Sequence, residues 1–94
     1  MMDDEFFLVI EDFVKSSKEL ADAAALCYDD PIKQDMVGLV REEFDSIQAR
    51  SEGIKLLITK DYKENRDFIL EEMRNIIGSS RNVATQIRDI LKGL

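Results

Sequence analysis

This chain of 94 residues contains no histidine and no tryptophan, and only one cysteine. Without histidine there is no imidazole to act as a general base, to complete a zinc finger or to hold a di-iron site in a helical bundle. A single cysteine cannot form an intramolecular disulfide. Cys27 has no histidine partner to activate it and falls on an apolar helix face, so we expect an inert core thiol.

The usual phosphate-binding loops are also missing, because neither a GxxxxGK[ST] nor a GxGxxG run occurs. The adjacent acids, such as Glu42 and Glu43, do not face one another on a helix and are typical of a solvated surface. We therefore expect no enzyme activity, no metal site and no cofactor.

Long hydrophobic runs are absent as well. The longest apolar runs, residues 6–10 and 23–27, are too short to cross a bilayer, so we expect no membrane span. No basic stretch followed by an apolar segment opens the chain, so we expect no signal peptide and a cytoplasmic protein.

Glycine and proline are scarce, at four and one, whereas a strand-rich fold needs frequent turn signals. Helix-forming residues dominate the rest, which predicts an all-α fold in a single domain, residues 1–94. Asp30 followed by Pro31 predicts a helix start, and Asp61 with Glu64 resembles a capping box. The predicted helices span residues 4–27, 31–59 and 62–92.

Each predicted helix carries apolar residues at alternating steps of three and four, which is a heptad seam. The first seam comprises Phe6, Ile10, Phe13, Ser17, Leu20, Ala24 and Cys27. The second comprises Val37, Val40, Phe44, Ile47, Ser51, Ile54 and Ile58. The third comprises Tyr62, Ile69, Met73, Ile76, Ser80, Val83, Ile87, Ile90 and Leu94.

A second apolar row widens two of these seams, which suits a helix that touches two neighbours. The added residues are Phe7, Val14 and Ala21 in the first helix and Leu70, Ile77, Ala84 and Leu91 in the last. We therefore predict an up-down-up three-helix bundle. The alternative is a short helix followed by one long helix that dimerises, since the seam continues through the second break with only a stutter.

Each seam also contains one serine, at positions 17, 51 and 80. These hydroxyls either form a polar layer that determines the register or bond back to a carbonyl one turn earlier, and we favour the second interpretation.

The net charge of −7 resides entirely in residues 1–35, which hold ten acids and three lysines. This acidity argues against a nucleic-acid partner and favours a basic protein surface as the partner.

Arg74, Arg81 and Arg88 recur every seven residues, as do Glu5, Asp12 and Glu19 in the first helix. We favour ion pairing between the two rows, with Asp12 near Arg74 and Glu19 near Arg81, over an arginine stripe that binds an acidic partner.

Several large apolar side chains fall on outer positions of the heptads, which suggests association with another protein or with a second copy of the chain. The candidate partner-binding residues are Leu8, Leu39, Leu56, Phe68, Arg74, Arg81 and Arg88. We predict a non-enzymatic helical interaction module that serves as an adaptor, assembly factor or regulatory subunit. The alternative is an acidic inhibitor that presents carboxylates to a nucleic-acid-binding protein in place of phosphates.

Overall fold

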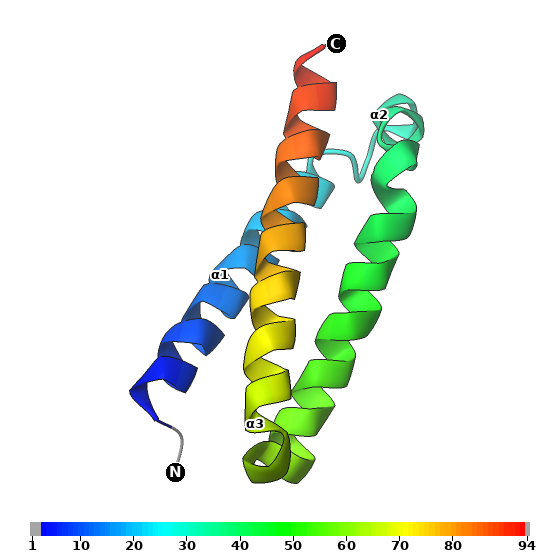
Figure 1. The fold of residues 1–94 in the computed structure, drawn as a ribbon. Helices are drawn as coiled ribbons and strands as arrows, with labels where there is room; N and C mark the ends of the chain where they lie inside the picture. Colours follow the sequence, from blue (N-terminus) through cyan, green and yellow to red (C-terminus); the bar gives the residue numbers. More distant parts are fainter. Residues whose placement is uncertain (1–2, 94) are drawn as a thin grey trace.

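The computed structural model describes residues 3–93 of the chain, and every regular element within them is helical (Figure 1). The all-α prediction is confirmed. The elements are α1 (Asp4–Ala25), α2 (Pro31–Met36), a short 3₁₀ helix η1 (Gly38–Val40) and α3 (Arg41–Lys92). None of these helices is both long enough and apolar enough to cross a membrane.

The helix starts follow the local sequence signals. The Asp3 carboxylate accepts a hydrogen bond from the Phe6 amide (2.8 Å) and so caps α1. The Asp30 carboxylate accepts from the amides of Ile32 (3.0 Å) and Lys33 (3.4 Å), while Pro31 occupies the first position of α2. The predicted cap at Asp30 is confirmed.

The predicted helix over residues 31–59 is wrong in its continuity, because α2 stops at Met36 and η1 separates it from α3. The segment 37–40 contains two valines and a glycine, all weak helix formers, so the tighter 3₁₀ turn replaces a regular α-helical turn there. The first helix also ends earlier than predicted, at Ala25 instead of residue 27.

The predicted break before residue 62 is present, because α3 (Arg41–Lys92) consists of two helical arms that meet at a kink. Asp61 alone leaves the helical conformation, with φ −145° and ψ 49°. A straight helix of 52 residues would be about 78 Å long, but the longest dimension of the molecule is 47 Å. The helix therefore doubles back at Asp61, as Figure 1 shows.

The two arms of α3, residues 41–60 and 62–92, lie side by side, and the second arm extends past α2 (Figure 1). An ion pair between Arg50 and Glu72 bridges them. At the turn, the side-chain amide of Asn65 donates to the Asp61 carbonyl (3.1 Å), where the sequence predicts a capping box with Glu64.

Helix α1 packs along α3, and its first turn lies near the turn of α3, because the Phe6 and Tyr62 rings meet edge to face at 4.5 Å. The second arm supplies the wide apolar stripe that its sequence predicts. Its buried hydrophobic residues are Ile69, Leu70, Met73, Ile76, Ile77, Val83, Ala84 and Ile87. Leu94, the last residue of the predicted third seam, lies outside the described residues.

The predicted second apolar row of α1 is wrong, because Phe7, Val14 and Ala21 are exposed. The buried face of α1 instead comprises Phe6, Phe13, Ser16, Leu20 and Ala23, and the buried Cys27 follows just beyond the helix. Ser16 and Ala23 of this face lie beside Asp12 and Glu19 of the acidic row, because residues four positions apart are neighbours on a helix surface. The acidic row forms ion pairs with the second arm, so the opposite flank of α1, which carries Phe7 and Val14, faces solvent.

The predicted serine layer needs one correction. Ser51 and Ser80 are buried as predicted, but Ser16 takes the place of Ser17 on α1. The Ser16 hydroxyl donates to the Phe13 carbonyl (3.0 Å), which is the back-bonding that we favour. The Ser80 hydroxyl is fully buried and, among the described residues, has no hydrogen-bond partner.

Candidate interaction surface

Ion pairs connect the acidic row of α1 with arginines of the second arm. Arg74 contacts Glu5 (3.4 Å), and Arg81 contacts both Asp12 (3.0 Å) and Glu19 (3.2 Å). The predicted pair of Glu19 with Arg81 is present. The predicted pair of Asp12 with Arg74 is wrong by one heptad, because the long Arg81 side chain reaches two carboxylates one α1 heptad apart.

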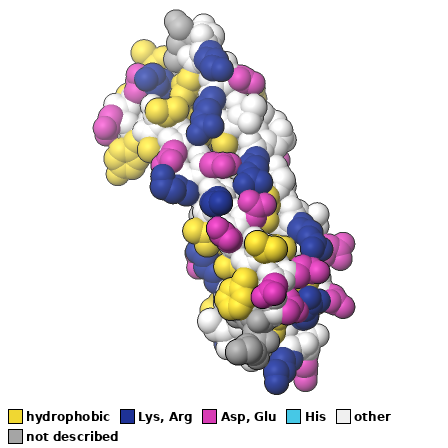
Figure 2. All heavy atoms as spheres, turned by 90° about the vertical axis from the view of Figure 1, so that its left-hand side faces the viewer, with side chains coloured by type: hydrophobic (Ala, Val, Ile, Leu, Met, Phe, Trp, Pro, Cys, Tyr) yellow, Lys and Arg dark blue, Asp and Glu magenta, His cyan; other side chains and the backbone are white. Residues whose placement is uncertain are grey.

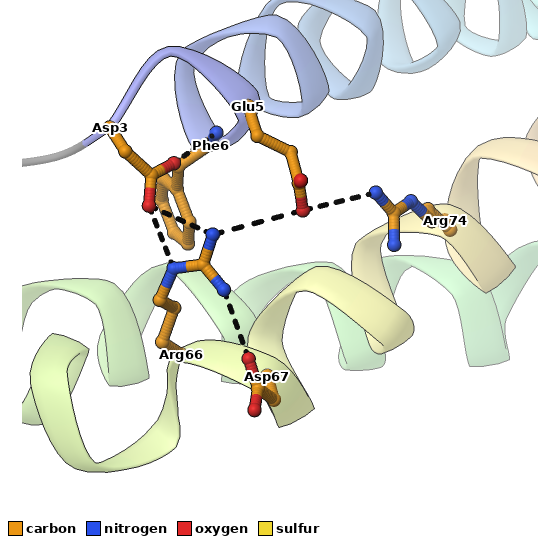
Figure 3. A network of polar contacts seen from close by, with 6 residues as sticks. All are labelled: Asp3, Glu5, Phe6, Arg66, Asp67 and Arg74. Atoms are coloured by element: carbon orange, nitrogen blue, oxygen red, sulfur yellow. Dashed lines mark hydrogen bonds and ion pairs between the residues drawn. The ribbon is translucent and has the colours of Figure 1, made fainter.

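A second network surrounds the start of α1 (Figure 3). The Arg66 guanidinium contacts Asp3 (2.8 Å), Asp67 (2.9 Å) and Glu5 (3.7 Å). Figure 3 shows Glu5 lying between Arg66 and Arg74, so one carboxylate joins both arginines. In the third heptad seam, Arg66 stands between Tyr62 and Ile69, where the spacing calls for an apolar side chain. In the structure this arginine forms ion pairs instead.

These contacts shift the pKa values of their members. The pKa of Asp3 lies below its ordinary value, first because the Phe6 amide donates to the carboxylate and then because of Arg66. The pKa of Asp12 is lowered chiefly by its hydrogen bond from Arg81. In return, the pKa values of Arg66 and Arg81 are raised, chiefly by their hydrogen bonds with Asp3 and Asp12 respectively.

The three arginines of the predicted stripe therefore differ. Arg74 and Arg81 are engaged by α1, with side chains 57% and 41% exposed. Arg88 is exposed and makes no ion pair within residues 3–93. The stripe is not a continuous row of unpaired cations.

The four apolar candidates are all exposed, with Leu39 the most exposed of them at 93%. Leu56 and Phe68 lie five residues before and seven residues after the turn at Asp61, whereas Leu39 lies roughly 25 Å away at the other end of the first arm. Leu8 lies on α1. The structure does not bring these four residues together on one face.

Several other apolar side chains are exposed that the sequence did not mark as candidate binding residues. Leu26, Tyr28 and Ile32 are 53–78% exposed and lie with Leu39 around the connection from α1 to α3. In Figure 2 hydrophobic side chains gather near this end of the molecule, and others are scattered among charged groups further down. The sequence does indicate this exposure, because Leu26, Tyr28 and Ile32 belong to none of the heptad seams and so have no predicted buried face.

A pocket of about 330 Å³ lies beside this connection. Its lining is mostly apolar and includes the buried thiol of Cys27. The side-chain amide of Gln34, also in the lining, already donates to the Tyr28 carbonyl (2.7 Å). The full lining consists of Ala24, Cys27, Tyr28, Gln34, Val37, Gly38, Val40, Arg41, Phe44 and Ile87.

Comparisons of the chain with protein-family models, curated proteins and solved structures give no match. The function of the chain is therefore inferred from its own surface.

Proposed function

We propose that this chain is an up-down-up three-helix bundle that acts as a non-enzymatic protein-interaction module, serving as an adaptor, assembly factor or regulatory subunit. The observation that carries the proposal is the amount of exposed apolar surface on so small a chain. Within the described residues, nine large hydrophobic side chains are more than half exposed, although the core is already well filled by buried side chains. Several of these side chains, Leu26, Tyr28, Ile32 and Leu39, lie around the connection from α1 to α3, and exposed apolar side chains gathered in one region are typical of a protein-binding surface.

The titratable groups that stand out within residues 3–93 also support a non-enzymatic role. The described cysteine is buried, and the two carboxylates with lowered pKa values, Asp3 and Asp12, are held by arginines. Arginine-paired carboxylates of low pKa are poor proton donors and acceptors near neutral pH. The ion-paired groups therefore support a role in holding α1 against α3.

The second candidate function is an acidic inhibitor that imitates the phosphates of a nucleic acid. The acidity of residues 1–35 favours it. The structure weakens it, because Glu5, Asp12 and Glu19 are neutralised within the chain by Arg74 and Arg81. A phosphate mimic needs carboxylates that are free to meet a basic partner, so we favour the apolar interaction module.

Site-specific photo-crosslinking in cells that express the protein tests the proposal. A photoreactive residue in place of Leu39 or Phe68 should give covalent protein adducts, because both side chains are exposed and apolar. The matched control positions are Glu42 and Lys63, which are exposed but charged. Equal yields at all four positions, or no adducts at any, would overturn the proposal.

Salt separates the two candidate functions. When the crosslinking is repeated in a lysate of the same cells, adduct yields at Leu39 should change little between about 50 mM and about 500 mM salt if apolar contacts dominate. A steep loss of adducts over this range would instead identify the acidic inhibitor.

A further inference from the structure

Helix α1 carries a second heptad seam, and the outer row of this seam is exposed in the described part of the chain. Its members follow steps of three and four along the outward flank of the helix: Phe7, Ile10, Val14, Ser17, Ala21 and Ala24. Phe7 and Val14 are 56% and 60% exposed, and Ala21 is exposed. Ile10, Ser17 and Ala24 are half-buried and form the inner edge of the strip. A seam of this spacing packs against another helix at a shallow angle.

We propose that this second seam binds the same seam of a second copy of the chain, with the two α1 helices antiparallel. The inference rests on the proposed function and identifies one partner for it. Two features of the seam, the order of its side-chain sizes and the order of its charges, select this occupant and this direction.

The size order is the first feature. An antiparallel pairing that is symmetric about the point between residues 15 and 16 places Phe7 opposite Ala24 and Ile10 opposite Ala21. The central layer places Val14 opposite Ser17. Each layer then joins one large and one small side chain, so the distance between the helices stays even along the seam. A parallel pair would place Phe7 against Phe7 and Ala24 against Ala24, leaving one end too wide and the other too thin.

The charge order is the second feature. Glu11 and Lys18 flank the seam on its solvent side, and the same antiparallel register places Glu11 of one copy beside Lys18 of the other, twice per dimer. The flanking charges on α1 are balanced, since Glu11 pairs with Lys15 (3.7 Å) and Lys18 with Asp22 (3.1 Å). The acidic row lies on the other side of α1, bound to the second arm, so it does not repel a second copy.

Sedimentation equilibrium of the full chain between about 1 µM and about 1 mM tests the inference, because a short seam predicts a Kd on the order of micromolar. The expected mass rises from 10.8 kDa toward twice that value. Ala21→Glu should weaken the dimer at least about tenfold while helix content is unchanged, since it places a charge within the seam. Ala49→Glu, at an exposed alanine of α3, is the matched control and should leave the Kd unchanged.

Charge reversal and disulfide formation test the direction. Glu11→Lys should weaken the dimer, and Glu11→Lys combined with Lys18→Glu should restore it. On a Cys27→Ala background, mixed Ile10→Cys and Ala21→Cys chains should cross-link to each other. Ala21→Cys chains alone should not, because antiparallel pairing separates their cysteines by about 16 Å.

A monomer at every concentration would overturn the inference, as would a dimer that Ala21→Glu leaves intact or one in which Ala21→Cys chains cross-link to each other. If the chain stays monomeric but gives photo-crosslinks at Leu39 or Phe68, the proposed homodimer is wrong while the proposed function still stands. A monomer without such crosslinks would overturn both.

Discussion

At the scale of single residues, burial separates positions that look equivalent in the sequence. Phe13 and Phe44 both occupy central seam positions, yet Phe13 is 5% exposed and belongs to the core, whereas Phe44 is only partly buried at its edge beside the pocket. The serines differ in the same manner, since Ser16 bonds to a carbonyl of its own helix and Ser80 does not.

Phe13→Ala should lower the free energy of unfolding by about 3–5 kcal/mol, because it removes a buried ring from a packed core. Phe44→Ala removes the same atoms from a partly exposed site and should cost clearly less. Urea denaturation followed by circular dichroism measures both. Equal losses for the two variants would contradict the assigned burial.

Ser80→Ala should leave stability unchanged or raise it by up to about 1 kcal/mol, because it removes a buried hydroxyl that has no partner among the described residues. Ser16→Ala is the control, since it removes a hydroxyl that is hydrogen-bonded. The same denaturation experiment compares them. A larger loss for Ser80→Ala than for Ser16→Ala would show that the Ser80 hydroxyl has a partner.

At the scale of elements, side-chain contacts determine which face of α1 meets α3. One flank of the core row on α1 carries Glu5, Asp12 and Glu19, and the other carries Phe7 and Val14. Ion pairs from Arg74 and Arg81 hold the acidic flank against the second arm, so the flank that carries Phe7 and Val14 faces solvent. Exposed pairs contribute little energy individually, but several of them on one flank favour the orientation in which that flank meets the arginines.

Arg81→Glu should lower Tm by a few degrees, because it places a third carboxylate beside Asp12 and Glu19. Adding Glu19→Arg should recover part of that loss but not all, since Asp12 still faces the new glutamate. Thermal unfolding of the two single variants and the double variant measures the coupling. Arg88→Glu serves as the control and should show no coupling with Glu19→Arg. Zero coupling between positions 19 and 81 would contradict the observed register.

At the scale of the whole molecule, the acidic first helix is held in the fold partly by Arg74 and Arg81 of the second arm. The chain carries a net charge of −7, and its excess acids lie in the N-terminal third, next to the arginines of the second arm. These contacts hold α1 along the second arm, while the kink at Asp61 lets α3 fold back within a molecule 47 Å long.

Stability should therefore depend on pH in the acid range. The pKa of Asp12 is lower in the folded chain than its ordinary value of 3.8. The folded state thus binds fewer protons there, so this stabilisation is fully present above about pH 4 and is lost as the pH falls through the folded value. Asp3 contributes in the same direction.

Asp12→Asn should reduce the difference in Tm between pH 7 and pH 3, because the variant has no carboxylate to protonate at that position. Asp35→Asn is the control, since Asp35 is exposed and forms no ion pair within residues 3–93, and it should preserve most of the wild-type difference. Differential scanning calorimetry at both pH values measures this. An identical pH dependence in wild type and Asp12→Asn would contradict the pairing with Arg81.

The sequence by itself determined the helical class, the cap at Asp30, the seams of both arms of α3 and the outward positions of Leu8, Leu39, Leu56 and Phe68, because these depend on local propensity and on helical periodicity. The break near Asp61 also follows from local sequence, whereas tertiary packing was needed to show which flank of α1 is buried and which carboxylates Arg81 contacts. Each of these two packing choices depends on the energy difference between alternative packings of distant residues, such as Phe6 against Tyr62, and no local pattern encodes that difference.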